Sequence, residues 1–278
     1  MMTETRTTTE LDVLCAEIAE QALLMRSAME QRKRIRNACG AFVRRLIGWS
    51  AADDEAERKR MRAAAQAAIA AIEKGEEPEI LSPACLVLAQ EYVNCVLASC
   101  EPWEVKEKVH RKQLGKLSKR LPVWMWAEGV KGLGEVMLGQ IIAETGNLDN
   151  YPNPAKVWKR LGQAPRDCYK MIKKDGTEGI TEPKQRKAVV WNAAECLIKA
   201  AGPYYQLYLE RKAYEEERYA DETVMDNGRK MTKGWRAARA ERVMVKRMLC
   251  DLWAAWRKED SRLPAGRQAE SAEKRIGV

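Results

Sequence analysis

Apolar residues recur every three or four positions along most of the chain, which is the spacing of one face of an α-helix. The first such stripe runs from Leu11 to Met29, and the apolar residues among 42–47 extend it as far as Gly48. Valine, isoleucine and threonine never gather into the alternating runs that are typical of strands. The pattern therefore predicts an all-α fold, with one polar stretch at 166–183 that could form either a small β-ribbon or a loop.

Capping residues and prolines divide this helical pattern into elements. Ser50 is a candidate cap for a second helix, and Ser82-Pro83 predicts the start of a third, whose apolar body we expect to be buried. Pro102 predicts the start of a separate fourth helix. Later helices are expected at about 184–200, 203–220 and 235–258. The chain then comprises a disordered tail at 1–10, a helical N-terminal region at 11–122, a second helical domain at 123–258 and a disordered tail at 259–278.

The second domain contains two glycines that flank one aliphatic residue, in Lys131-Gly132-Leu133-Gly134-Glu135, just before an apolar helix. Glycine permits backbone angles that other residues resist, and it lets the backbone come close to a phosphate. The amides that begin the following helix would point outward, and the helix dipole favours an anion there. The segment therefore predicts a helix-hairpin-helix that binds phosphates. The alternative is a tight turn between helices that needs glycine only for packing. A dinucleotide-binding Gly-x-Gly-x-x-Gly fits poorly, because Met137 occupies the third glycine position.

The net charge suggests a kind of partner. Lysine and arginine number 49 against 40 acidic residues, a formal net charge of +9, which suits a polyanion such as DNA or RNA. Basic residues after the hairpin and in the last helix could reach such a partner, although they could equally be solvated helix faces. The basic stretch 184–187 begins a predicted helix, where the dipole disfavours cations unless an anion lies nearby. The residues that we expect to contact nucleic acid are Lys131, Gly132, Leu133, Gly134, Glu135, Lys156, Lys159, Arg160, Arg236, Arg239 and Lys246.

The sequence offers little support for a metal site, disulfide bonds or a membrane-spanning helix. The eight cysteines are scattered, no Cys-x-x-Cys pair occurs and His110 is the only histidine, which argues against a zinc site. We expect buried, reduced thiols in a cytoplasmic protein with no metal and no cofactor. The acids at 53–55 are better explained by the start of a helix than by metal binding. No run approaches the eighteen apolar residues of a transmembrane helix, and residues 1–10 lack signal-peptide character, so we expect no membrane partner.

Several further motifs follow the hairpin in order. Glu144 and Gly146 end its second helix, Tyr151-Pro152 makes an aromatic-proline loop, and the stretch 162–165 begins with glycine and ends with proline. A basic, tryptophan-bearing helix at 239–256 comes last. Together these features resemble the C-terminal domain of the IS-one-ten insertion-sequence transposases, the RNA-guided serine recombinases, over about residues 127–256. The chain as a whole is similar to prophage and mobile-element proteins that share this half. The resemblance implies a domain that binds nucleic acid in a mobile element.

The chain departs from that family in its chemistry. The family's nucleophilic serine has no counterpart, because no serine lies between Ser118 and Ser261. Cys168, Thr177 and Thr181 lie in the corresponding region, but nothing nearby in the sequence would activate them. The family's RuvC-like α/β half also has no counterpart in the helical N-terminal region. We therefore expect binding without catalysis. Two alternatives stay open: a divergent recombinase with an altered active site, and an assembly protein whose N-terminal helices pair with another chain, such as a second copy.

Overall fold

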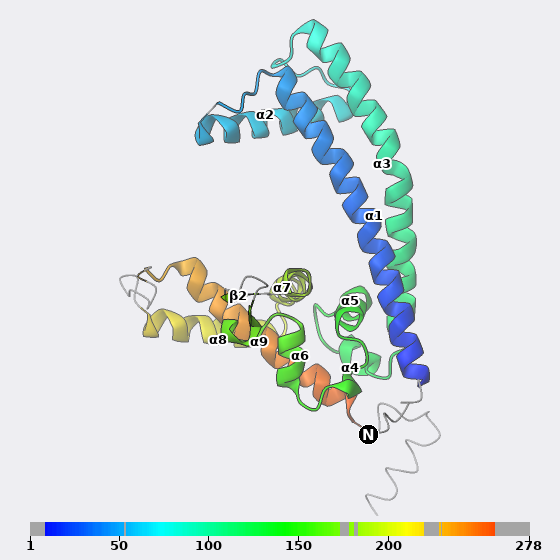
Figure 1. Cartoon of the computed structure of the whole chain (residues 1–278), viewed down its shortest axis with the longest axis vertical. Coiled ribbons are helices and arrows are strands. Elements are labelled where there is room, and N and C mark those ends of the chain that lie inside the picture. The colour runs from blue at the N-terminus through cyan, green and yellow to red at the C-terminus, as the bar shows by residue number, and fades with distance from the viewer. Residues whose placement is uncertain are drawn as a thin grey trace, which may run out of the picture. The chain divides into compact units, whose positions relative to one another are not determined.

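The computed structural model describes residues 9–258, except for 53, 173–177, 181–182, 220–227 and 229. The fold class is all-α, as the sequence predicts (Figure 1). The described residues form the helices α1 (Glu10–Leu46), α2 (Glu55–Glu73), α3 (Pro83–Ser118), α4 (Trp124–Glu128), α5 (Glu135–Thr145), α6 (Pro154–Arg160), α7 (Lys184–Lys199), α8 (Pro203–Arg218) and α9 (Lys233–Trp256). They also form two 3₁₀ turns, η1 (Leu148–Asn150) and η2 (Arg166–Tyr169), and an antiparallel ribbon of β1 (Lys170–Ile172) with β2 (Glu178–Ile180). The polar stretch therefore contains the ribbon. Thr177, Thr181 and nearly all of the two predicted tails lie outside the described residues.

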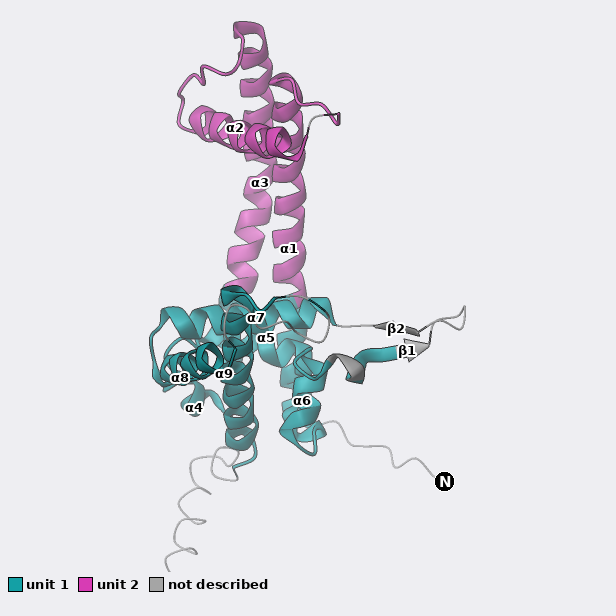
Figure 2. Ribbon diagram, turned by 90° about the vertical axis from the view of Figure 1, so that its left-hand side faces the viewer, with its two compact units in different colours: residues 1–22, 112–278 teal, residues 23–111 magenta. Residues whose placement is uncertain are grey.

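The chain forms two compact units (Figure 2). Unit 1 combines residues 1–22 with residues 112–278, and unit 2 comprises residues 23–111. Helices α1 and α3 each run from one unit into the other without interruption. The boundaries between the units, at 22–23 and 111–112, differ from the predicted boundary at 122–123. The first turns of α1 belong to unit 1 because they pack with the second half of the sequence. There the Asn147 side-chain amide donates to the Asp12 carboxylate at 2.8 Å, and Arg120 lies 3.4 Å from Glu17.

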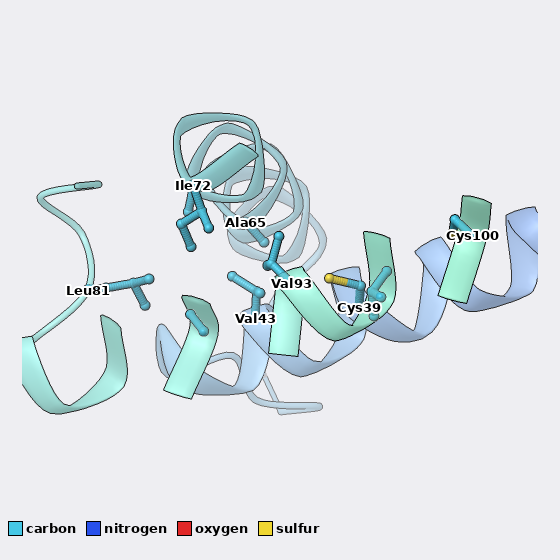
Figure 3. Packing of buried hydrophobic residues seen from close by; sticks show 10 residues of the cluster. Cys39, Val43, Ala65, Ile72, Leu81, Val93 and Cys100 are labelled. Atoms are coloured by element: carbon cyan, nitrogen blue, oxygen red, sulfur yellow. The ribbon is translucent and has the colours of Figure 1, made fainter. Parts of the chain in front are cut away.

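Unit 2 is built around a core between α1, α2 and α3. Val43 on α1, Ala65 and Ile72 on α2, and Val93 on α3 are all buried (Figure 3). The face that α2 turns toward this core is rich in alanine, so the helix brings few large side chains into it. Burial of this apolar surface is the main source of stability of the unit.

Side-chain caps fix where α2 and α3 begin. The Asp54 carboxylate accepts a hydrogen bond from the Glu57 amide at 2.8 Å, so Asp54 is the N-cap of α2 and the predicted cap, Ser50, lies before the helix. Ser82 does cap α3, as predicted, since its hydroxyl accepts from the Cys85 amide at 3.4 Å. Both acceptors satisfy amides that have no partner within the helix.

Helix α3 differs from two predictions. Pro102 does not begin a new helix, because α3 runs continuously from Pro83 to Ser118. Pro102 and Ala98, one turn before it, are both exposed, so water can bind the carbonyl that the proline leaves without a donor. The expected burial of the apolar body of α3 holds for only part of it, because Ala89 and Val93 are buried whereas Val87 and Leu88 are 56% and 50% exposed.

Among the described residues, α3 is the one helix whose length and composition would allow it to cross a membrane, and 22% of its apolar window is buried. Core helices of soluble proteins meet the same criterion, so the expected lack of a membrane partner stays a prediction.

Helix α9 lies at the centre of unit 1, where it packs against α4, α6, α7 and α8. Its apolar face includes Met244, Met248 and Leu252, each fully buried. Helices α5 and α7 run antiparallel: the turn before α5 contacts the last turn of α7, and Glu144 near the end of α5 contacts Arg186 in the first turn of α7. Each end of α5 therefore lies beside an end of α7, and each of these places holds residues that the sequence singles out.

Candidate functional site

The segment 129–134, the predicted glycine hairpin, joins α4 to α5, and Gly132 is required there for structural reasons. Its φ of +92° lies in the left-handed region that favours glycine. A Cβ at this position would lie 2.7 Å from the carbonyl oxygen of Cys196 in α7, far inside ordinary contact distance. Leu133, which follows, is 1% exposed and anchors the hairpin in the core. Close packing thus explains the first glycine without any ligand.

Gly134 has a different environment. It is the N-cap of α5 with an extended backbone (φ −72°, ψ 169°), and no atom lies within 4 Å of the place where a Cβ would be. No side chain caps the first amides of α5. The start of the 11-residue helix is therefore open to an incoming group, and its amides and dipole favour an anion.

The charges around this helix start are mixed. Lys131 is exposed beside it. The Glu135 carboxylate lies in the first turn of α5, 3.9 Å from the Lys119 ammonium, so one acid already complements the dipole. Of the five predicted hairpin contacts, Leu133 is buried and Glu135 would repel a phosphate. Lys131 and the backbone at Gly134 are the groups that can receive one.

A groove with a stronger positive charge lies at the other end of α5. It has a volume of about 520 Å³ and is formed where the ends of α5 and α6 meet the start of α7. We call it the basic groove, and it is lined by Glu144, Lys159, Arg160, Tyr169, Pro183, Lys184, Gln185 and Arg186. Four of these side chains are cations and one is a carboxylate, so the groove carries an excess of positive charge.

Contacts within the groove hold its cations in place. Arg160 Nε donates to the Glu144 carbonyl oxygen at 3.0 Å, and Arg186 Nε lies 3.4 Å from the Glu144 carboxylate. The Tyr169 hydroxyl donates to the Lys159 carbonyl oxygen at 2.9 Å, which ties η2 to the end of α6. An arginine has five N–H donors, so these bonds leave others for a ligand. Lys159 and Lys184 make no ion pair with any residue that the structure describes.

The first turn of α7 adds to the positive potential of the basic groove. Pro183 is its N-cap, no side chain caps its amides and no acidic residue lies in the first turn. Lys184, Gln185 and Arg186 stand there instead, in an arrangement that the helix dipole disfavours. An oxyanion in the groove would satisfy both the amides and the cations. The predicted contacts Lys159 and Arg160 lie here, whereas Lys184 and Arg186 are absent from the predicted contact list, although the basic helix start in the sequence points to them.

The predicted contacts on α9 are mostly engaged elsewhere. Arg236 is 5% exposed and donates to the Tyr219 carbonyl oxygen at 3.0 Å. Arg239 Nε lies 2.8 Å from Glu215, a fully buried carboxylate on α8 that also pairs with Arg211. The predicted basic face of the last helix is therefore turned toward α8 at these two positions, and a phosphate would have to displace existing bonds to reach them.

Lys246 on α9 contacts a side chain of α6, and Lys156 lies on α6 itself. The Lys246 ammonium lies 5.0 Å from the centre of the Trp158 ring, and burial, with the nearby Arg242 charge adding to it, lowers the pKa of that ammonium. Lys156 is exposed, one helical turn before Lys159 and Arg160. Its spacing places it on the same side of α6 as the basic groove. The structure thus brings Lys156, Lys159 and Arg160 together and leaves Arg236 and Arg239 apart from them.

No group of three or more metal-binding side chains occurs among the residues that the structure describes. Cys168 is exposed next to Tyr169. Comparison with protein-family models, curated proteins and solved structures gave no match to the chain. The resemblance to the transposase domain therefore stays a prediction.

Proposed function

We propose that the protein binds nucleic acid through its phosphates, without cutting it, as a cytoplasmic component of a prophage or mobile element. The observation that carries the proposal is the basic groove, which is lined by four cations, one carboxylate and an uncapped helix start. Oxyanions are the natural ligands of such a site. Contacts of this kind hold a backbone in place without reading its sequence.

The open start of α5 offers a second contact on the same rigid helix. From Glu135 to Glu144 the helix rises by about 14 Å. In a duplex strand, which advances about 3.4 Å per nucleotide, this corresponds to roughly four nucleotides. One phosphate at the hairpin and others in the basic groove can therefore belong to the same strand.

The test is the salt dependence of binding. Full-length protein is titrated into labelled duplex DNA and structured RNA between 50 and 200 mM salt, with fluorescence anisotropy as the readout. Four phosphate contacts predict a slope of log K against log salt of about −3.6, hence a loss of roughly 150-fold over this range. The double variant Lys159→Gln/Lys184→Gln is expected to lower the affinity and to reduce the slope to about −1.8.

A matched control keeps the change in net charge and moves it to unit 2. Lys59 and Lys74, both exposed on or beside α2, are replaced by glutamine, and this variant is expected to bind like the wild type. The proposal fails if neither nucleic acid binds at low salt, or if the groove variant and the control behave alike. The hairpin is tested separately with Gly134→Val, because the open surroundings of Gly134 allow a side chain there. Unchanged binding by this variant would remove the hairpin from the interface.

A second candidate is self-assembly through the N-terminal helices. In unit 2, large apolar side chains are exposed on α1 and α3, among them Leu23 at 61%, Val105 at 53% and Val109 at 50%. Exposed apolar surface of this kind is typical of interfaces between chains. Light scattering of the wild type and of Val105→Lys/Val109→Lys distinguishes the cases. An oligomer that the double variant breaks supports assembly, whereas a monomeric wild type at high concentration excludes it.

A further inference from the structure

Unit 2 contains a cavity of about 550 Å³ between α1, α2 and the N-terminal half of α3. Its floor is apolar and well buried: Cys39 is 2% exposed, Ala65 1% and Val93 1%. These three side chains come from three different helices that surround the same space (Figure 3). The volume falls within the range of about 300–1,000 Å³ that small-molecule sites occupy.

Small residues facing one another explain why the cavity exists. On α2, alanines at 65 and 70 line it, and on α1 the lining includes Gly40. A Cβ at Gly40 would meet only the Arg44 guanidinium, at 3.7 Å, so the missing side chain is not needed for close packing. Three helices that meet through such residues leave room that larger side chains would fill.

Arginines surround the apolar floor. Arg36, Arg44 and Arg62 line the cavity, with Glu73 as its one acidic residue. Arg36 is paired with Glu73 at 3.2 Å. Arg44 and Arg62 make no ion pair with any residue that the structure describes. Two guanidinium groups beside the apolar floor therefore have no ionic partner among the described residues.

We propose that this cavity binds an amphipathic carboxylate, with its head group held by Arg44 and Arg62 and its aliphatic chain on the floor formed by Cys39, Ala65 and Val93. Guanidinium groups match the planar geometry of a carboxylate and can bond both of its oxygens. A purely polar anion fits less well, because it would leave the apolar floor without apolar contacts. The site lies in unit 2, so it is independent of the nucleic-acid proposal for unit 1 and would add a small-molecule ligand to it.

The test is calorimetric titration of the full-length protein with octanoate, decanoate and dodecanoate below their micelle-forming concentrations. The dissociation constant is expected to fall about fourfold for each added methylene until the cavity is filled. 1-Decanol and inorganic phosphate, which carry only one half of the proposed chemistry each, are expected to bind much more weakly. Equal binding of decanol and decanoate, or no heat from any of the carboxylates, would overturn the proposal.

Variants assign the binding to this cavity. Arg44→Gln/Arg62→Gln is expected to weaken decanoate binding by about tenfold or more. The matched control, Arg45→Gln/Arg58→Gln, changes neighbouring arginines on the same two helices that do not line the cavity and is expected to bind normally. Gly40→Leu places a side chain into the cavity and is expected to abolish binding while circular dichroism shows an intact helical fold. Wild-type affinity in both the double arginine variant and Gly40→Leu would refute the site.

Discussion

Gly132 and Gly134 lie two residues apart in one hairpin, yet replacement by alanine is expected to affect them very differently. At Gly132, a left-handed φ of +92° costs a residue with a Cβ about 1–3 kcal/mol. The new Cβ, 2.7 Å from the Cys196 carbonyl oxygen, also forces α7 or the hairpin to move, which adds about 1–3 kcal/mol. Together, about 2–6 kcal/mol is a large part of the roughly 5–15 kcal/mol that stabilises a domain.

At Gly134 the same substitution meets no obstacle, since φ is −72° and no atom lies within 4 Å of the new Cβ. Alanine is a poorer N-cap than glycine by about 0.5–1 kcal/mol. It also restricts the unfolded chain, which favours folding by about 0.4–1 kcal/mol. The two effects nearly cancel, so the free energy of unfolding of Gly134→Ala is expected to lie within about 0.5 kcal/mol of that of the wild type.

Urea denaturation followed by tryptophan fluorescence is the suitable assay. Of the nine tryptophans, all but Trp49 and Trp103 belong to unit 1, so the signal reports mainly on the unit that holds the hairpin. Gly132→Ala is expected to lower the urea midpoint clearly and Gly134→Ala to leave it in place. Equal midpoints for Gly132→Ala and the wild type would show that neither the left-handed turn nor the contact with α7 is needed, and would refute the reasoning.

Three further predictions concern stability. Gly40→Ala is expected to stabilise unit 2 by about 0.5–1 kcal/mol, because it removes a glycine from the interior of α1 where a Cβ has room; thermal unfolding by circular dichroism measures the gain. Glu215→Gln is expected to cost about 2–3 kcal/mol, since Arg211 and Arg239 lose a buried partner but stay partly solvated; an unchanged urea midpoint would contradict it. Burial, with the Glu195 charge adding to it, raises the pKa of Glu241 from 4.5 to about 7, so the folded protein holds a proton that the unfolded chain has released. The free energy of unfolding should therefore fall by about 3 kcal/mol as the pH rises from 4.5 to about 7. Glu241→Gln should be more stable than the wild type at pH 8 but not at pH 5.

The sequence correctly predicts two helix ends that depend on neighbouring residues, although it offers Ser50 where Asp54 caps α2. Ser82 caps α3 and Gly48, with a left-handed φ, follows the end of α1, because both effects act within one turn of the chain. Pro102 is different. Whether a proline ends a helix depends on whether its surroundings can solvate the freed carbonyl and hold both halves in line, and this is set by packing at a distance.

The basic residues show the same limit. Lys159 and Arg160 lie together because they are adjacent on a short helix. Arg236 and Arg239 look equally available in the sequence, yet their partners come from α8 and the residue that follows it, about twenty positions earlier. The basic groove joins the ends of three helices, so only the tertiary structure shows that Lys184 and Arg186 belong with α6.

The interrupted sequence of unit 1 has a consequence for the order in which a growing chain can fold. Asp12 is separated by 135 residues from its partner Asn147. At about 5–20 residues per second, a ribosome needs roughly 7–27 s to make that stretch. Unit 2 is a single uninterrupted segment and is complete by residue 111. We expect it to fold first, while Leu14 and Ile18, buried in the finished protein, stay exposed on the nascent chain until the second half of unit 1 emerges. During those seconds we expect the apolar side chains in the first turns of α1 to be accessible to chaperones.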